Sequence, residues 1–440
     1  MKNKKFLIIG GMVIFLMGIS VSVAIAQKPY SGVALKVSMI DEIRERQIIK
    51  LLPAFEEKTG MKVHIDLYGF EELYHKNLAG CYGHTGEYDV LQLHHPDLPL
   101  FSQWLFDISD WIKRDWKEID VDDIYPLLRE THMRYNGKWY GMPTHVNPMV
   151  LFYRKDILAE YGFTVPRTWD ELIKMANTIT DKLAPKVYGV TFMGRKEIQL
   201  ACTYLNFLGS YGQYIYKHTS KGLEPTINSP GAVEALEKLV QLKGPALPGV
   251  TGYGFDENMM AFARGKAATS IMWSSVVGVY KDPAKSAVVG KWGIARMPGV
   301  KLPDGTIRSR ALLGGWSVCI SKDSKHKKAA WEFLKWLISK KLERELVPYY
   351  ESCRISLLSN PEIQKDWPNY KAFYEILKAG PIDFPGVPPG EKIMPDYEVL
   401  DYMEVALSDT LMGVTSPKAA LDDLEDTYYK IFRRWGMYKP

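Results

Sequence analysis

The chain has 440 residues, enough for about two or three domain-sized units with ample core. Hydrophobic residues make up 46% and charged residues 24%, an ordinary composition for a soluble globular protein. The formal net charge is +5, and it falls to +2 without residues 1–26, which hold three lysines and no acidic residue. A nearly neutral chain argues against nucleic acid as the main partner.

Residues 1–26 have the pattern of a secretory signal peptide. Three lysines precede an apolar run from Phe6 to Val23, and Ala24-Ile25-Ala26 fits a small-residue cleavage site. We therefore expect a periplasmic protein that is exported through a cleavable signal. The run is close to membrane-spanning length, so a retained anchor is the alternative. No cysteine lies near the cleavage point, which argues against a lipid anchor.

The four cysteines are Cys81, Cys202, Cys319 and Cys353. An exported protein either pairs such cysteines or keeps them as buried thiols, and both alternatives stay open. No C-x-x-C spacing is present, so zinc binding and thiol redox chemistry are not expected. We predict neither a metal nor a cofactor.

Two acidic residues come directly after the first predicted strand, Ala34–Ile40. Asp41 and Glu42 follow it directly, before an amphipathic helix in which Pro53 is expected to cause a kink or a break. Ligands of open α/β sheets bind beyond the carboxyl ends of the strands. Asp41 and Glu42 are therefore candidate acceptors for ligand hydroxyl groups, and capping of the helix is the alternative.

Another predicted strand, Tyr88–Leu93, ends in a pair of histidines. His94 and His95 lie where the edge of a pocket is expected, by the same argument about strand ends. The alternative is two solvated loop histidines. A metal site is not favoured, because adjacent histidines rarely converge on one ion without further ligands.

The segment from Asn136 to Leu172 has the pattern of a chain that leaves one lobe and enters another. A glycine turn and a short aromatic strand precede an apolar run, Met149–Tyr153. A helix start follows, in which Thr168 is expected to cap the helix and Glu171 to reach back to the cap.

Two tryptophans follow or end predicted strands. Trp273 ends the apolar strand that begins at Thr269, and Trp316 follows Gly314 and Gly315. A glycine pair in a strand allows a ligand or a neighbouring backbone to come close.

Six sequence patterns, in this order, resemble motifs of the sugar-binding group of extracytoplasmic solute-binding proteins of ABC transporters. They are F-E-x-x-T-G-M-x-V at 55–63, the Y-D-V strand at 88–90, N-G-K-x-Y-G-x-P from residue 136, the P-x-T-W-D-E-L helix start at 166–172, the helix-to-strand unit at 255–273, and G-G-x-x-x-x-I-S at 314–321. The resemblance spans nearly the whole chain after residue 26.

The resemblance implies an α/β protein with a two-lobe, type II periplasmic binding protein-like fold and a hinge of three crossings. The first lobe is expected from 27–145 and 300–347, and the second from 146–299 and 348–440. The ligand is expected in the cleft between the lobes, which close on it. The implied function is to capture a carbohydrate, either a sugar or a polyol, for the permease of an ABC importer. We expect a monomer that is not an enzyme.

The expected ligand contacts lie at strand ends and lobe junctions. Trp316 and Trp273 are the candidate platforms for the apolar face of a sugar ring, and a core role is the alternative for each. The candidate polar contacts are Asp41, Glu42, His94, His95, His145, Asn147, Arg354 and Tyr397. For Arg354, bracing of the hinge is the alternative role.

Two other functions stay open. One is the binding of another solute, such as a polyamine or iron, and an acid-rich cleft would favour the polyamine. The other is an exported carbohydrate hydrolase with two catalytic carboxylates, although no pattern singles out such a pair. No G-x-S-x-G elbow, H-E-x-x-H helix, P-loop or G-x-G-x-x-G is present in the sequence.

Overall fold

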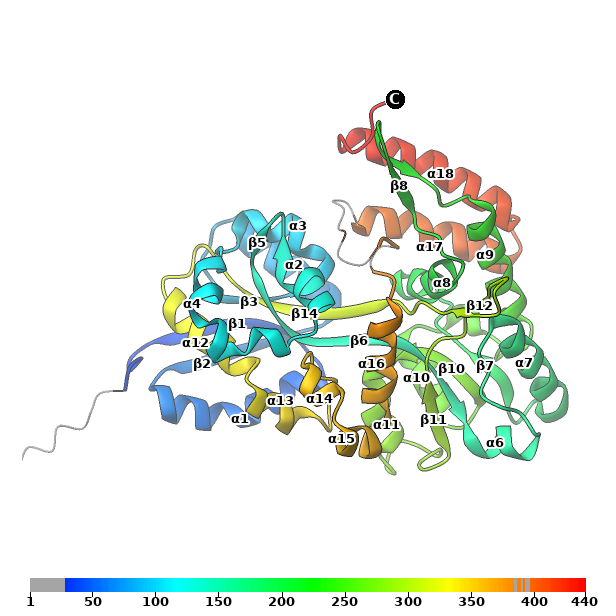
Figure 1. The fold of residues 1–440 in the computed structure, drawn as a ribbon, viewed down its shortest axis with the longest axis horizontal. Helices are drawn as coiled ribbons and strands as arrows, with labels where there is room; N and C mark the ends of the chain where they lie inside the picture. Colours follow the sequence, from blue (N-terminus) through cyan, green and yellow to red (C-terminus); the bar gives the residue numbers. More distant parts are fainter. Residues whose placement is uncertain (1–27, 384–385, 389–390, 392–395) are drawn as a thin grey trace, which may run out of the picture.

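The computed structural model describes residues 28–383, 386–388, 391 and 396–440. The predicted signal peptide, residues 1–26, lies outside the described residues. Two α/β lobes lie side by side and are connected by long strands that pass from one to the other (Figure 1). In the part of the chain that the structure describes, no helix has the length and hydrophobicity needed to span a bilayer.

The first lobe contains a four-stranded part of the sheet, with the order β2-β1-β3-β14. Its strands are β1 (Ala34–Ile40), β2 (Lys62–Tyr68), β3 (Val90–His94) and β14 (Leu313–Ile320). Its main helices are α1 (Ile43–Thr59), α2 (Phe70–Tyr82), α4 (Ser109–Ile119) and α12 (Lys327–Leu337). The first three strands are parallel, and β14 is antiparallel to β3. This arrangement brings the carboxyl ends of β1 and β3 to the same edge of the sheet.

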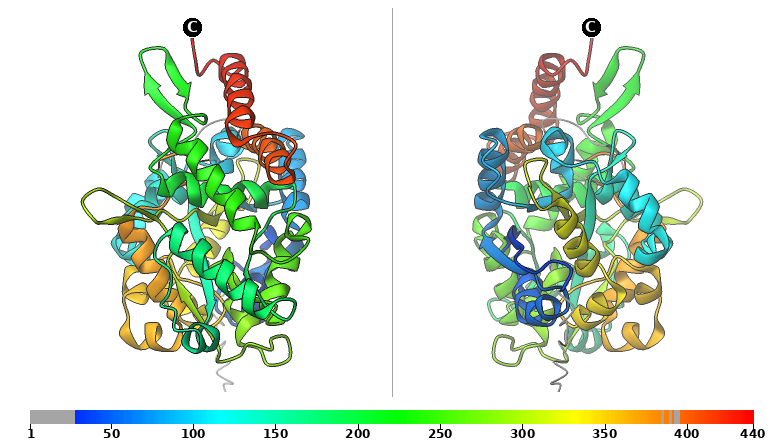
Figure 2. Two further views of the ribbon diagram at one scale, coloured as in Figure 1. Left: turned by 90° about the vertical axis from the view of Figure 1, so that its right-hand side faces the viewer. Right: turned by 90° about the vertical axis from the view of Figure 1, so that its left-hand side faces the viewer.

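The second lobe is built on the other strands of the same sheet. They are β7 (Tyr188–Thr191), β10 (Ala267–Trp273) and β11 (Trp292–Ala295). Its main helices are α7 (Trp169–Leu183), α8 (Ile198–Ser210), α9 (Pro230–Lys243), α10 (Phe255–Ala263), α17 (Asp396–Met412) and α18 (Pro417–Arg434). Figure 2 shows α18 and the hairpin of β8 (Tyr216–Thr219) and β9 (Gly222–Pro225) at one end of the molecule.

Strand β6 (Gly141–Arg154) belongs to both lobes. Its first part pairs with β14, from Gly141 opposite Cys319 to Pro148 opposite Leu313. From Met149 onward it pairs with β10 and then also with β11. The partner therefore changes between residues 148 and 149, and the expected boundary at 145/146 falls just before this point.

The second lobe boundary lies later than expected. Residues 300–312 were assigned to the first lobe, but β12 (Val300–Lys301) and β13 (Ile307–Arg308) form a hairpin on the second lobe. There the Arg308 side chain donates a 2.8 Å hydrogen bond to the carbonyl oxygen of Ser210. Leu312 is buried in the core of the second lobe, whereas Leu313 is buried in that of the first. The chain therefore crosses between these two residues.

The third crossing also lies later than expected. Residues from 348 onward were assigned to the second lobe, but Cys353, Leu357 and Phe373 are buried in the core of the first. The chain first joins the core of the second lobe at Ile376, and Ile382 then forms a β-bridge with Leu312. The apolar face of α14 (Ile355–Leu358) is buried in the first lobe, whereas α16 (Pro368–Ala379) lies at the junction, with Phe373 in the first core and Ile376 in the second.

The predicted helix start at Thr168 is confirmed. Thr168 and Glu171 form a reciprocal capping box at the start of α7. Ser229 and Ser416 cap α9 and α18, each with a proline in the first turn. By contrast, Pro53 lies inside α1 without ending it. The helix continues because its buried face, which includes Leu52 and Phe55, is held by the core.

The cysteines do not form the disulfide framework that the sequence left open. Cys81, Cys202 and Cys353 are buried free thiols, so two disulfides cannot form. The alternative of buried thiols is therefore confirmed for these three residues. Burial raises the pKa of the Cys81 thiol to about 12, which makes it unreactive at neutral pH.

The glycine pair in β14 permits two close approaches. A β-carbon added to Gly314 would lie 2.8 Å from the ring of Trp273, and one added to Gly315 would lie 2.7 Å from the carbonyl oxygen of His145. Gly315 also has a φ of +154°, which side-chain-bearing residues rarely adopt. The prediction that the glycine pair allows a neighbouring part of the protein to come close is thus confirmed.

We predict that Gly315→Ala lowers the free energy of unfolding by about 1–3 kcal/mol, because the new methyl group meets a backbone oxygen that cannot move easily. Urea unfolding of the two proteins measures this difference. Gly252→Ala is the control, since nothing lies within 4 Å of its added β-carbon. Equal effects of the two substitutions would contradict the proposed steric cause.

Candidate ligand-binding cleft

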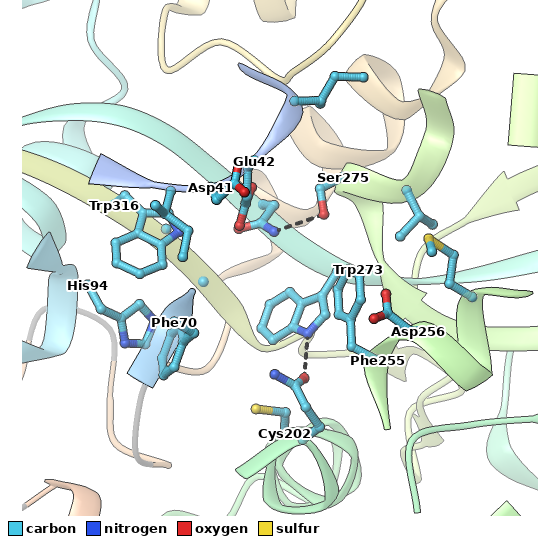
Figure 3. A pocket seen from close by; sticks show the side chains of 18 of the residues that line it. Asp41, Glu42, Phe70, His94, Cys202, Phe255, Asp256, Trp273, Ser275 and Trp316 are labelled. Atoms are coloured by element: carbon cyan, nitrogen blue, oxygen red, sulfur yellow. Dashed lines mark hydrogen bonds between the residues drawn. The ribbon is translucent and has the colours of Figure 1, made fainter. Parts of the chain in front are cut away.

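A cavity of about 490 Å³ lies between the two lobes. The first lobe contributes residues from the ends of β1 and β3, the start of α2, and strands β6 and β14. The second contributes residues from α8, from the start of α10 and from the end of β10 (Figure 3). The side chains that carry polar or aromatic groups are Asp41, Glu42, Phe70, His94, Asn147, Gln199, Phe255, Asp256, Trp273, Ser275 and Trp316.

Six of the ten residues proposed from the sequence line this cavity. They are Asp41, Glu42, His94, Asn147, Trp273 and Trp316. The two tryptophans come from different lobes, so a solute between them contacts both. Asn147 lies on β6 and donates a 3.4 Å hydrogen bond to Ser275 of the second lobe.

The two tryptophans are held firmly by their surroundings. Trp273 is 6% exposed, and its indole N–H donates a 2.8 Å hydrogen bond to the side-chain oxygen of Gln199. Trp316 is also 6% exposed and packs edge-on against Phe70, with a ring-centroid distance of 5.5 Å. Both rings are therefore positioned before a ligand arrives, which lowers the entropic cost of binding.

The carboxylate of Asp41 is already paired. Arg46 donates two hydrogen bonds to it, of 2.6 and 2.8 Å. These bonds are the main reason why the pKa of Asp41 lies below its ordinary value. Asp41 therefore remains ionised, and Arg46 compensates its charge.

Glu42 lies above a buried polar cluster. Its carboxylate oxygen is 3.7 Å from Nε2 of His145, whose other ring nitrogen is 3.4 Å from Glu45. Glu45 in turn contacts the guanidinium of Arg44 at 3.2 Å and accepts a 3.0 Å hydrogen bond from Gln92. His145, Glu45 and Arg44 are almost completely buried, whereas 34% of the Glu42 side chain is exposed.

This cluster changes the protonation of its members. Burial between the lobes and the neighbouring charge of Glu45 raise the pKa of Glu42 to about 8. Burial also lowers the pKa of His145, against the opposing effect of Glu45, and so favours the neutral imidazole. Of the two glutamates, Glu45 keeps the negative charge, because contacts with His145 and the Arg44 guanidinium and a hydrogen bond from Gln92 stabilise its carboxylate.

Four of the proposed residues do not line the main cavity. His145 lies behind Glu42, with its ring 4.0 Å from that of Tyr350. His95 is buried, with Nε2 2.6 Å from Asp383 and Nδ1 3.2 Å from the carbonyl oxygen of Gly315. Tyr397 lines a smaller hollow beside the cavity, where its ring lies 4.9 Å from Tyr74.

Arg354 is the fourth of these residues, and its contacts are structural. Its guanidinium donates to the backbone carbonyl oxygens of Ile119 and Ile338 and lies 3.4 Å from Glu343. The residue is 1% exposed. These contacts are those of a brace within the first lobe, and Arg354 does not reach the cavity.

Several lining residues were missed from the sequence. Phe70 and Phe255 are the first residues of α2 and α10, each directly after a glycine. A glycine followed by an aromatic residue at a helix start was the signal that could have found them. Gln199 and Ser275 gave no such signal, because each is an ordinary polar residue whose role depends on Trp273 or Asn147.

Among the described residues, no group of three or more histidine, cysteine, aspartate or glutamate side chains is arranged to hold a metal ion. The adjacent His94 and His95 diverge accordingly. His94 lines the cavity, whereas His95 is bonded to Asp383 behind it.

A cavity between two α/β lobes that share strands defines the class of two-lobe periplasmic binding proteins. The chain belongs to the bacterial extracellular solute-binding protein family, which matches residues 41–343. A solved structure of an ABC transporter solute-binding protein from Agrobacterium radiobacter K84, in complex with ribitol, is 30% identical with a TM-score of 0.81. The similarity covers 92% of this chain and 100% of that one. This likeness confirms the predicted two-lobe α/β fold.

Two relatives show the range of the family. A probable amino-acid ABC transporter periplasmic-binding protein of Sinorhizobium fredii is 25% identical over 426 residues, which cover 94% of this chain and 92% of that protein. The erythritol/L-threitol-binding protein of Mycolicibacterium smegmatis is 25% identical over 330 residues, which cover 70% of this chain and 67% of that protein.

We predict that Glu42 makes the ligand-free protein less stable as the pH rises. Because its pKa rises from 4.5 in the unfolded chain to about 8 in the folded one, its contribution is complete below pH 4.5 and is lost as the pH rises through about 8. The difference in free energy of unfolding between Glu42→Gln and the unsubstituted protein should therefore shift by about 1–2 kcal/mol in favour of the variant from pH 5 to pH 8. This figure allows for the partial exposure of Glu42.

Urea unfolding at the two pH values measures this effect. Glu57→Gln, on the exposed side of the same helix, is the control and should show the pH dependence of the unsubstituted protein. If Glu42→Gln also shows that dependence, the pKa of Glu42 is not raised.

Proposed function

We propose that the chain is the substrate-binding component of an ABC importer and that it captures a carbohydrate or polyol in the interlobe cavity. The observation that carries the proposal is the pair of fixed tryptophans, Trp273 and Trp316, which line one cavity from opposite lobes. In this function the chain is a periplasmic monomer that delivers its solute to the membrane permease.

The chemistry of the lining suits a polyhydroxylated solute. Aromatic rings pack against the apolar C–H faces of such a molecule. Asn147, Gln199 and Ser275 supply donors and acceptors for its hydroxyl groups. A cavity of about 490 Å³ is also within the range of small-molecule sites.

Contacts from both lobes connect binding to the state that the permease recognises. A solute that touches Trp316 on one lobe and Trp273 on the other stabilises the closed arrangement over an open one. Strand β6 is a suitable hinge strand for this closure, because it runs through both lobes and connects them.

The relatives support the same solute class. The Agrobacterium protein binds ribitol, and the Mycolicibacterium relative is named for erythritol and L-threitol. The Sinorhizobium relative is named for an amino acid. An amino-acid carboxylate is usually held by a cation or by backbone N–H groups, and no lysine or arginine is among the described residues that line the cavity. We therefore favour the sugar or polyol.

A thermal-shift screen of residues 27–440 tests the proposal. The screen contains mono-, di- and trisaccharides, polyols, polyamines and iron, with a separate assay for release of sugar from glycosides. A solute at 100 times its dissociation constant stabilises the protein by about 2.7 kcal/mol. Stabilisation by one sugar or polyol class supports the proposal. Stabilisation by polyamine or iron alone, or release of sugar, would replace it with one of the two other functions.

We predict that Trp316→Ala lowers the affinity for the solute found in the screen by about tenfold or more, because it removes a stacking surface. Titration calorimetry measures this change. Trp435→Ala is the matched control, since Trp435 is 45% exposed directly after α18, outside the cavity. The idea fails if Trp316→Ala, folded at the assay temperature, binds the solute as tightly as the control.

A further inference from the structure

The charged groups in the cavity are of one sign. Asp41, Glu42 and Asp256 supply three carboxyl groups, and no lysine or arginine is among the described lining residues. His94 is the one lining side chain in that set with a titratable basic group. The described lining of the cavity therefore offers carboxyl groups, and no lysine or arginine, to whatever enters it.

Two of these carboxyl groups lack a cationic side chain beside them. Arg46 compensates Asp41, and Arg44 compensates Glu45 below the cavity floor. Glu42 has His145 at 3.7 Å, and burial favours the neutral form of that histidine. Asp256 is exposed on the other lobe and forms no ion pair among the described residues. Tyr350, next to His145, adds no positive charge.

The walls of the cavity suit a cation as well as a sugar ring. Trp316 and Phe70 line it from the first lobe, and Trp273 and Phe255 from the second. The faces of aromatic rings carry partial negative charge and attract ammonium groups, most strongly where water is excluded. The aromatic and the acidic residues therefore favour the same kind of group.

We propose that the preferred solute is a sugar or polyol that carries a protonated amine, and that Glu42 accepts a hydrogen bond from its ammonium group. The proposal rests on the proposed function, because it names a solute class for the same cavity. The hydroxyl groups contact Asn147, Gln199 and Ser275, and Asp256 adds long-range attraction from the second lobe.

The protonation of Glu42 is consistent with this assignment. Burial and the nearby charge of Glu45 raise the pKa of Glu42, and the positive charge of Arg44, which is paired with Glu45, offsets this only in part. An ammonium group beside Glu42 would supply further positive charge, so binding would release the proton that Glu42 holds near neutral pH. Binding of a neutral polyol would not require that release.

Calorimetric titration of residues 27–440 with matched pairs of solutes tests the inference. The pairs are glucosamine with glucose, and 1-amino-1-deoxysorbitol with sorbitol; N-acetylglucosamine keeps the nitrogen but not the charge. We expect the amine of at least one pair to bind about tenfold more tightly than its neutral partner at pH 7. The preference should decrease at high salt, and the observed heat should depend on the buffer, because a proton is released.

Two variants locate the effect. Glu42→Gln should lose most of the preference for the amine, whereas Glu57→Gln makes the same replacement on the exposed side of α1, outside the cavity, and should keep it. Both are titrated with the same pairs, and circular dichroism confirms that each is folded.

The outcomes separate this inference from the proposed function. Neutral sugars or polyols that bind as tightly as their amines, or an amine preference that Glu42→Gln retains, overturn the inference and leave the proposed function in place. Spermidine that binds more tightly than every hydroxylated amine overturns the proposed function in favour of a polyamine. If none of these solutes binds, the inference fails, and the thermal-shift screen with its di- and trisaccharides decides the proposed function separately.

Discussion

The structure depends on one strand that two lobes share. β6 pairs with β14 through its first part and with β10 through its second. In that register Trp316 lies opposite His145, and Trp273 lies opposite Met149. Four residues of extended chain span about 13 Å, so the strand itself sets the spacing of the two aromatic walls. Backbone hydrogen bonds thus fix the positions along β6 from which the two aromatic walls rise.

The same shared strand places the electrostatic cluster. His145 on β6 lies against Glu42 and Glu45, which begin the segment after β1. The floor of the cavity is therefore a network of buried ionisable groups at the junction of the two lobes. Such a network is stable because each buried charge has a partner, and Glu42 is the member whose partner is weakest. A solute with a group that pairs with Glu42 gains affinity, because the protein alone leaves this carboxyl group with only a weak partner.

Much of this arrangement could be predicted from the sequence, for a physical reason. Strands with strong apolar runs are easy to locate, and polar or aromatic residues at their ends, such as Glu42 and Trp273, lie at the sheet edge where ligands bind. What failed were the assignments that depend on packing between distant segments. Residues 300–312 and the segment around Cys353 and Leu357 were placed in the wrong lobe, because local pattern does not tell which core an amphipathic segment joins. Arg354 and His145 are at strand or hinge positions, but their side chains turn into the core.

The order of segments has a consequence for how the protein forms. The sheet of the first lobe requires β14, where Ile320 pairs with Val90, and the second lobe requires helices after residue 396. Neither lobe can therefore be completed until most of the chain has been synthesised. Long sequence separations between paired strands slow folding. The nascent chain is expected to remain without two complete lobes for much of synthesis, a period in which a chaperone can engage it.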